Sequence, residues 1–410
     1  MAAEALAARR TGRSSLRALK HSSFALYFTG NLLSNCGTWF QNIALALLVF
    51  RLTQSTFWVG VVNFAQFIGV VLLAPWAGSA ADRFNRRQLI VTTQVGAATV
   101  SALLAWLIAI HRGALPVVLT LALLLGATTA FSTPAQQAII PALVPRDDLS
   151  AAIAMNSVTF NLARAVGPVA GAFVVARLGI AWAIAVNAGS YLIFAAAILI
   201  IHIEVRQERA VGRVKLRESV KMLGRDPTLA ILLGVVAVVS LTMDPVSTLT
   251  PAIATRFFHR PDTYAGILIG AFGTGAVIGS VVPLHDTDAP GRRIAVMLAL
   301  LAAGMIAFAA LAGSPVALVL LAIGGFGYLI GQTTATTELQ LRVSDRERGR
   351  VMALWSVAFL GTRPIAALID GGLASWIGAR VTIIVLAVPS LVAAAIVLRL
   401  HTRQEAATRP

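Results

Sequence analysis

Cysteine, histidine and charge are all scarce in this chain. The 410 residues include a single cysteine, Cys36, so no internal disulfide can form. The six histidines fall at or near the ends of apolar runs, which argues against a buried metal site or a histidine proton relay. The Gly-x-x-x-x-Gly-Lys-Ser/Thr loop that holds nucleotide phosphates is missing, so we expect no direct use of ATP, no cofactor and no bound metal.

Apolar residues are correspondingly abundant. Charged residues make up 12% of the chain and hydrophobic residues 58%, and the mean hydropathy is +0.82. A soluble protein of this composition could not cover its surface with polar groups. Apolar runs of about 18 residues or more recur from end to end, and each is long enough to cross a hydrocarbon core of roughly 30 Å. The fold class we predict is an all-α polytopic membrane protein.

The apolar runs divide the chain into twelve expected transmembrane helices. They cover residues 24–50, 56–77, 88–110, 115–137, 151–176, 181–203, 228–256, 263–284, 294–312, 315–337, 351–374 and 378–399. The domains we predict are a tail over 1–23, a six-helix bundle over 24–203, a linker over 204–226, a second six-helix bundle over 227–400 and a tail over 401–410.

The basic residues predict the orientation of the chain. Of the 33 lysines and arginines, 25 lie in the tails, the linker and the loops on the same side as the termini, and six lie in the opposite loops. Cytoplasmic loops of membrane proteins carry the excess of Lys and Arg, so both termini are expected in the cytoplasm. The same bias accounts for the net charge of +16 without a nucleic-acid partner.

A short, charge-rich stretch lies between the second and third expected helices. Its key residues are Gly78, Asp82, Arg83, Arg86 and Arg87. Their spacing resembles the signature loop of the major facilitator superfamily, in which the acid helps to latch the two halves on the cytoplasmic side. The resemblance implies that Asp82 faces the start of the eleventh helix near Gly349 and Arg350, where the helix dipole favours an anion. Asn85 replaces a family glycine, and Asn tolerates the positive φ that this position suggests.

The two halves of the chain repeat one another. A shift of 199 residues places Arg164 on Arg363 and Gly179 on Gly378. Two six-helix halves related by such a repeat are typical of transporters, with a substrate site near the midplane where the halves meet. The charged stretch is less well repeated, because Pro283 stands where its acid would be. The predicted latch is therefore asymmetric.

Two arginines lie near the centres of expected transmembrane helices. A charge at that depth costs at least about 2.5–3.5 kcal/mol, so Arg164 and Arg363 should face a cavity or a partner. They can attract an anionic group of a substrate or set the protonation of a nearby carboxylate. Alternatively, they can tie helix to helix through backbone carbonyl groups.

Two carboxyl groups also fall well inside expected helices. A carboxyl group held away from water can exchange a proton near neutral pH, which makes Asp244 and Asp370 candidates for proton coupling. The alternatives are that Asp244 is permanently paired with Arg164 or Arg363, and that Asp370 sits at the outer membrane interface.

Polar residues follow one face of the first expected helix. Asn31, Asn35, Thr38 and Asn42 are spaced by four, three and four residues. Lipid cannot satisfy amides, so this face should look into the protein or into a water-filled cavity, together with Gln136 of the fourth helix. Hydrogen bonding between helices is the alternative to lining a substrate cavity.

Further motifs extend the family resemblance. Gly167-Pro168-x-x-Gly171 resembles a motif that exporters of the superfamily carry on the fifth helix, where small residues allow close packing and proline eases a bend. Leu19-Lys20-His21-Ser22-Ser23-Phe24, Phe131-x-x-Pro134-Ala135 and Asn161-x-x-Arg164 look like the bacterial branch that includes enterobactin exporters and related secretion and macrolide-efflux transporters.

The resemblance implies a monomeric secondary exporter in the bacterial cytoplasmic membrane. It would move a small organic molecule, such as a drug, a siderophore or another secondary metabolite, out of the cell by alternating access, in exchange for protons. The expected partners are that substrate, protons and the lipid bilayer. An uptake symporter on the same fold and a non-transporting membrane protein are the alternatives, and no cluster of nucleophilic or metal-binding residues at one membrane face favours an enzyme.

Overall fold

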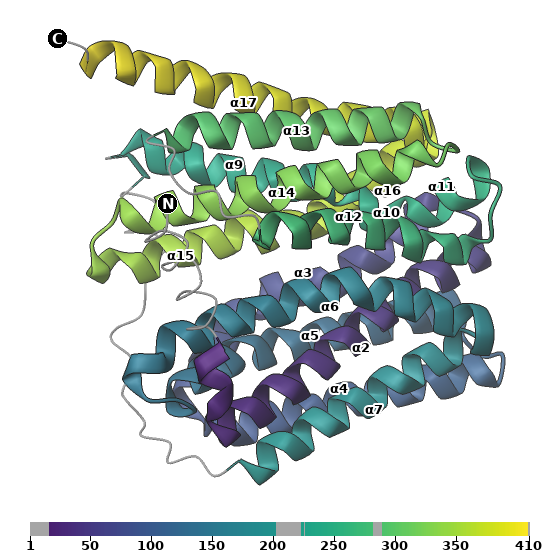
Figure 1. The fold of residues 1–410 in the computed structure, drawn as a ribbon. Coiled ribbons are helices and arrows are strands. Elements are labelled where there is room, and N and C mark those ends of the chain that lie inside the picture. Colours follow the sequence, from purple (N-terminus) through teal and green to yellow (C-terminus); the bar gives the residue numbers. More distant parts are fainter. Residues whose placement is uncertain (1–15, 202–222, 225, 282–288, 409–410) are drawn as a thin grey trace. The chain divides into compact units, whose positions relative to one another are not determined.

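The computed structural model describes residues 16–201, 223–224, 226–281 and 289–408, and the secondary structure within these ranges is helical (Figure 1). Twelve segments of this described part are long and apolar enough to cross a membrane. The prediction of an all-α membrane protein with twelve transmembrane helices is therefore confirmed.

The α-helices of the first half are α2 (Ser22–Thr53), α3 (Thr56–Arg83), α4 (Arg86–Ala109), α5 (Leu115–Ile139), α6 (Leu149–Leu178) and α7 (Ile180–Ile200). Those of the second half are α9 (Pro227–Met243), α10 (Pro245–Thr248), α11 (Thr250–Arg256), α12 (Ala265–Val281), α13 (Pro290–Ala310), α14 (Val316–Leu341), α15 (Asp345–Leu360), α16 (Thr362–Ile377) and α17 (Ala379–Thr408). Short 3-10 helices are η1 (Leu16–Lys20), η2 (Ile140–Ala142), η3 (Arg146–Asp148) and η4 (Asp262–Tyr264).

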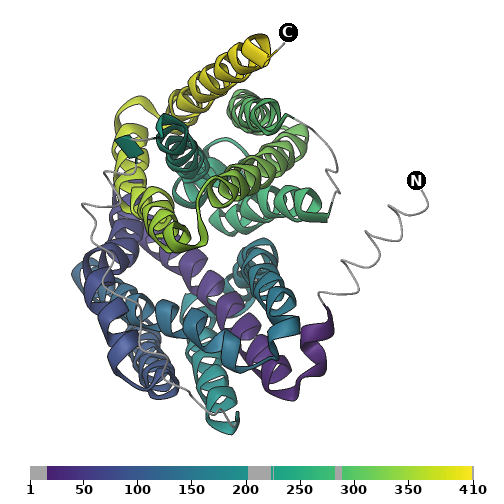
Figure 2. The ribbon, with the colours of Figure 1, turned by 90° about the vertical axis from the view of Figure 1, so that its left-hand side faces the viewer.

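The chain forms two compact units. The first comprises Met1–Leu48 and Ala65–Ala210, and the second comprises Val49–Phe64 and Val211–Pro410. Within the first unit α4 packs against α5 and α7, and within the second α13 packs against α14 and α17 (Figure 2). The segment Val49–Phe64, which we name the outer arm, holds the predicted external turn between the first two transmembrane helices, and it groups with the second half of the chain.

Two expected transmembrane helices of the second half are interrupted. Proline lacks an N–H group and its ring clashes with the carbonyl four residues earlier, so it breaks a helix. Pro245 and Pro251 accordingly divide the seventh transmembrane segment into α9, α10 and α11. Pro364 removes the bond that would return to Leu360, and the eleventh segment divides into α15 and α16 at Gly361.

Both halves turn at a matching glycine. Gly179 lies between α6 and α7 with φ +92°, and Gly378 lies between α16 and α17 with φ +85°. Side chains disfavour this left-handed region, so glycine allows the chain to reverse within one residue. These are the two glycines that the 199-residue repeat superimposes.

The charged stretch between the second and third transmembrane helices is shorter than expected. α3 continues to Arg83 and α4 begins at Arg86, so only Phe84 and Asn85 lie between them. Asn85 does not use the positive φ that Asn tolerates: its φ is −61° and its ψ is 116°. Its side chain instead accepts hydrogen bonds from the backbone N–H groups of Arg87 and Gln88, which is the N-cap role that an extended backbone permits.

Two arginines of this stretch bind the ends of neighbouring helices. Arg86 Nη1 donates to the carbonyl of Ala138 in the last turn of α5 at 2.9 Å. Arg87 Nε donates to the carbonyl of Ile198 in the last turn of α7 at 3.1 Å, and its Nη2 donates to Leu199. The last carbonyls of a helix have no partner within it and carry partial negative charge, so a cation stabilises them.

We predict that Arg87→Ala destabilises the first unit, because two terminal carbonyls of α7 lose a charged donor. The cost should be about 1–2 kcal/mol, visible as a melting temperature lowered by a few degrees in detergent. Arg83→Ala is the matched control, since Arg83 is exposed at the end of α3. Equal melting temperatures for the two variants would contradict this role of Arg87.

Candidate functional site

The second unit contains a buried cluster of charged residues, which we name the carboxyl cluster: Asp244, Arg363 and Asp370. Their exposed fractions are 2%, 5% and 0%. Arg363 Nε lies 3.8 Å from Asp244 Oδ1, and the Asp370 carboxyl group interacts electrostatically with that of Asp244. Arg363 and Asp370 lie on the same face of α16, and Asp244 comes from a different transmembrane segment.

Proline and helix ends position the cluster. Asp244 is the residue that caps α9, directly before Pro245, and its backbone carbonyl accepts from the N–H groups of Ser247 and Thr248. Arg363 is the second residue of α16, directly after the break at Gly361. Both side chains therefore stand where a transmembrane helix is interrupted, the kind of place at which transporters bind ions and charged groups.

A hydrogen-bond chain leads from the cluster to the outer arm. Thr248, one helical turn after Asp244, donates from Oγ1 to Asp244 Oδ2 at 3.3 Å. Asn63 of α3 donates from Nδ2 to Thr248 Oγ1 at 3.1 Å. Both links are buried. Sequence reasoning missed Thr248, although its spacing of four residues from Asp244 is the signal that two side chains share a helix face.

The charges of the cluster do not balance when both acids are ionised. Two carboxylates and one guanidinium then sum to −1, whereas one bound proton makes the cluster neutral. Burying a charge without compensation costs several kcal/mol, so the protonation of the cluster is tied to its surroundings. Neither oxygen of Asp370 makes a hydrogen bond of ordinary geometry within the described residues. A proton on either carboxyl group is the simplest way to relieve this arrangement.

The structure places these residues within their own units. Asp244 lies against Arg363 in the second unit, and Arg164 belongs to the first. Asp370 is fully buried in the second unit. Arg164 is 7% exposed, and its guanidinium carbon lies 5.9 Å from the centre of the Trp39 ring, within the range of a cation–π interaction. The roles of these residues in proton coupling and substrate binding stay predictions.

The polar stripe of α2 is largely satisfied inside the first unit. Asn31 donates to Asn156 at 3.1 Å, Asn35 donates to Asn31 at 2.9 Å, and Thr38 shares a hydrogen bond with Tyr191 at 3.1 Å. The bonds of Asn31 and Thr38 join α2 to other helices, and that of Asn35 lies within α2. Whether this face also meets a substrate stays a prediction.

Two other residues predicted to line the substrate cavity also lie in the first unit. Asn42 is half-buried, and Gln136 donates to Ser132, one turn earlier on α5. Whether these two side chains meet a substrate stays a prediction.

One buried polar group in the first unit was not anticipated. Gln41 Oε1 accepts hydrogen bonds from Ser101 at 2.8 Å and from Asn187 at 2.7 Å. These three side chains join α2, α4 and α7, and each is at most 3% exposed. A lone amide such as Asn187 inside an apolar helix is the sequence signal that predicts a hydrogen bond between helices.

The glycines of the fifth transmembrane helix lie against α2. A methyl group at Gly167 would come within 2.5 Å of Trp39 Cβ, and one at Gly171 within 2.8 Å of Phe40 Cα. α6 continues through Pro168. These contacts show close packing, and the hinge role of the motif stays a prediction.

The predicted cytoplasmic latch is only partly described. Gly78 lies within α3, and a methyl group there would meet nothing within 4 Å. The side chain of Asp82 and the surroundings of Gly349 lie outside the described part of the structure. The latch therefore stays a prediction.

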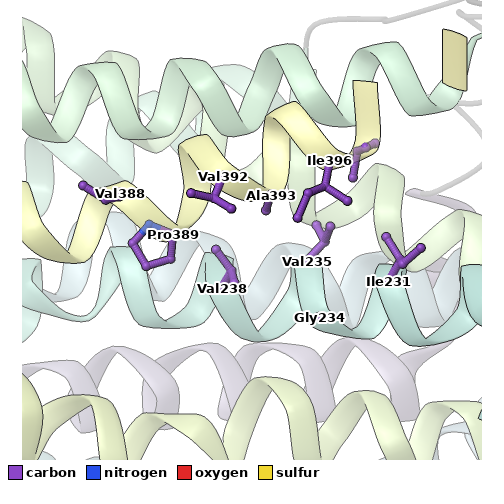
Figure 3. A pocket seen from close by; sticks show the side chains of 10 residues that line it. Ile231, Gly234, Val235, Val238, Val388, Pro389, Val392, Ala393 and Ile396 are labelled. Atoms are coloured by element: carbon purple, nitrogen blue, oxygen red, sulfur yellow. The ribbon is translucent and has the colours of Figure 1, made fainter. Parts of the chain in front are cut away.

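A second feature of the second unit is an apolar cavity of about 500 Å³ between α9 and α17 (Figure 3). Its lining is made of aliphatic residues, Gly234 and Pro389. Binding sites for polar molecules need at least a few polar groups to orient the ligand, so the carboxyl cluster is the better candidate. No group of three His, Cys, Asp or Glu side chains placed to hold a metal ion occurs among the described residues.

A family model and several known transporters are similar to this chain. The family model described as "Transmembrane secretion effector" (MFS_3) matches residues 13–409. The enterobactin exporter EntS of Salmonella typhimurium is 26% identical over 373 residues, 86% of this chain and 86% of its own. The staphyloferrin A transporter of Staphylococcus aureus is 26% identical over 265 residues, 62% of this chain and 65% of its own. These matches confirm the resemblance that the motifs predicted.

Solved structures share the fold. A bacterial homolog of the human lysosomal transporter Spinster, in an inward-facing and unoccupied conformation, superimposes with a TM-score of 0.70 at 16% identity over 93% of this chain and 98% of its own. The nucleoside transporter NupG superimposes with a TM-score of 0.70 at 12% identity over 92% and 98%. Identities this low establish the architecture and leave the substrate open.

We predict that Arg363→Met strongly destabilises the protein, because it leaves two buried carboxyl groups without their cation. Removing one partner of a buried ion pair costs about 3–5 kcal/mol, measurable as a large drop in melting temperature in detergent. The double variant Arg363→Met with Asp244→Asn should recover part of that loss, since one carboxylate goes with the cation. Simple additivity of the two single effects would contradict the pairing.

Proposed function

The chain belongs to the transmembrane secretion effector family of the major facilitator superfamily, and we propose that it is a secondary exporter that exchanges protons for a small organic molecule. The observation that carries the proposal is the carboxyl cluster. Two acids and one arginine lie buried inside transmembrane segments, where ionisable residues are costly and mark ion pathways.

The cluster suits proton exchange for an electrostatic reason. Asp244 lies against Arg363 and interacts with the second buried carboxyl group, Asp370, so ionising both acids brings two negative charges together inside the membrane. One proton neutralises the cluster, and a substrate group that donates hydrogen bonds or carries positive charge could replace it. Proton and substrate would then compete for one site, which is what exchange requires.

The substrate class we propose is a siderophore or another secondary metabolite. The support is the similarity to the enterobactin exporter EntS over 86% of both chains, together with the similarity to a staphyloferrin A transporter. Export rather than uptake is supported by the similarity to the exporter EntS and by the Gly167-Pro168-x-x-Gly171 motif of α6. We propose that both termini lie in the cytoplasm, that the chain acts as a monomer, and that Asp82 takes part in a cytoplasmic latch.

Inverted membrane vesicles test the proposal. Acidifying their interior by respiration should drive accumulation of a substrate from a panel of siderophores and antibiotics, and an uncoupler should abolish it. Asp244→Asn should weaken the dependence of accumulation on the pH gradient at least about tenfold while leaving substrate-for-substrate exchange, because Arg363 then faces a neutral amide in place of the candidate proton-binding group.

Asp226→Asn is the matched control for this experiment. Asp226 caps the other end of α9 through the N–H of Thr228, and Asn serves equally well at that position. Its transport should therefore follow the pH gradient as the parent does. Accumulation that ignores the gradient would contradict proton exchange. A rise in cellular uptake of the substrate on overexpression would favour the uptake symporter instead.

A further inference from the structure

We propose that the outer arm, Val49–Phe64, is an external gate that the ionised carboxyl group of Asp244 holds shut through Thr248 and Asn63. The inference rests on the proposed proton exchange and adds to it the residues that convert protonation into movement. Three sets of contacts hold the arm, at its base, along its length and at its tip, and all lie within the second unit.

The chain itself makes the arm a separate element. α2 leaves the first unit between Leu48 and Val49, and α3 returns to it between Phe64 and Ala65. The arm consists of the ends of two helices whose remaining residues pack elsewhere. Its contacts with the second half are therefore the ones that must break if the predicted external side is to open.

Along its length the arm fits against α16 without spare room. Thr56 Oγ1 donates to the carbonyl of Gly371 at 3.3 Å. A methyl group at Gly60 would lie 2.3 Å from the carbonyl oxygen of Ala367, and one at Gly371 would lie 2.7 Å from the carbonyl oxygen of Thr56. We name this contact of α3 with α16 the seam. The two backbones are in direct contact at the seam, so a small displacement of α3 away from α16 opens it.

At its tip the arm carries a bidentate ion pair. Arg51 donates from Nε and Nη2 to the two oxygens of Asp262 at 2.6 and 2.8 Å. The Asp262 side chain is only 11% exposed, and bidentate geometry is the case in which such a pair contributes to stability. The tip therefore holds the closed arm in place independently of Asp244, and the base is the part that responds to protonation.

At the base of the arm, the direction of the hydrogen bonds links Asn63 to the charge of Asp244. Thr248 has one O–H group, which it donates to Asp244, so its oxygen is left to accept the amide of Asn63. A bond to a carboxylate is roughly twice as strong as one between neutral groups. Protonation of Asp244 replaces the charged acceptor with a neutral one. It therefore weakens both hydrogen bonds between Asp244 and Asn63.

The protonation of Asp244 depends on the charged groups that face it from α16. Arg363, whose Nε lies 3.8 Å from Asp244 Oδ1, and the carboxyl group of Asp370 both interact with Asp244. When Asp244 is ionised, its bond to Thr248 holds the base of the arm. A proton on Asp244, or a substrate group that neutralises it, releases the arm. The ionised carboxyl group thus holds the arm closed on this side.

Labelling of a single cysteine tests the gate in the full-length protein. The background carries Cys36→Ser, and the reporter is Thr56→Cys, placed in the seam where the native side chain is 2% exposed. A membrane-impermeant maleimide is added to right-side-out vesicles. The thiolate is the reacting form, so each rate is divided by the rate of the same variant unfolded at the same pH. This relative rate should be about fivefold higher near about pH 5.5 than near about pH 8, the ratio expected when a charge-assisted hydrogen bond becomes a neutral one.

Variants of the chain should remove that pH dependence. Asn63→Leu and Asp244→Asn should label fast at both pH values, because each breaks or neutralises the link. Gly371→Ala should also label fast, since its methyl group displaces the arm, whereas Gly372→Ala should match the parent because nothing lies within 4 Å of it. Should Thr56→Cys not fold, Ala367→Cys, fully buried in the same seam, replaces it as reporter.

The outcomes separate the gate from the proposed function. Slow labelling of Asp244→Asn at both pH values, or of Asn63→Leu, overturns the gate. So does labelling of the parent that ignores pH while transport still follows the pH gradient, and proton exchange then stands. Transport that ignores the gradient while labelling follows pH refutes proton exchange, with the link between Asp244 and the arm intact.

Discussion

The ion pair of Arg363 with Asp244, with Asp370 beside it, is the constraint around which the second half of this transporter is organised. Inside a membrane no bulk water can replace a missing partner, so a buried guanidinium and two carboxyl groups must be brought together by the fold. The breaks in the two transmembrane segments that supply them follow from this need. Pro245 and Pro364 release backbone groups at the points where the charged side chains stand, and helix ends tolerate charge better than helix interiors.

The two halves use the repeated arginine differently. Arg164 and Arg363 occupy matching positions in the sequence, yet Arg164 lies over the ring of Trp39 and Arg363 lies against a carboxylate. The first unit joins several of its amides to one another, through Gln41 with Asn187 and along the polar stripe of α2. A fully bonded polar network rigidifies a bundle, whereas a buried carboxyl group can exist in two charge states.

The charged stretch between α3 and α4 illustrates how one motif serves two purposes. Its spacing resembles a family signature, while Arg86 and Arg87 bind the terminal carbonyls of α5 and α7 within their own unit. Asn85 supplies the cap that starts α4. Local stabilisation thus accounts for the basic end of the motif, and its acid is left for the conformational role that the family resemblance implies.

The sequence by itself determined the fold class, the number of transmembrane helices and the family, because length, apolarity and short motifs are local properties that each segment carries alone. It also singled out Asp244, Arg363 and Asp370, since charge inside an apolar run is conspicuous. Only the tertiary structure decided which of them meet. Partners such as Thr248 with Asn63, or Arg51 with Asp262, lie 185 and 211 residues apart, and nothing in their local pattern pairs them. Such contacts depend on how helices pack, and packing satisfies polar groups across the whole bundle at once.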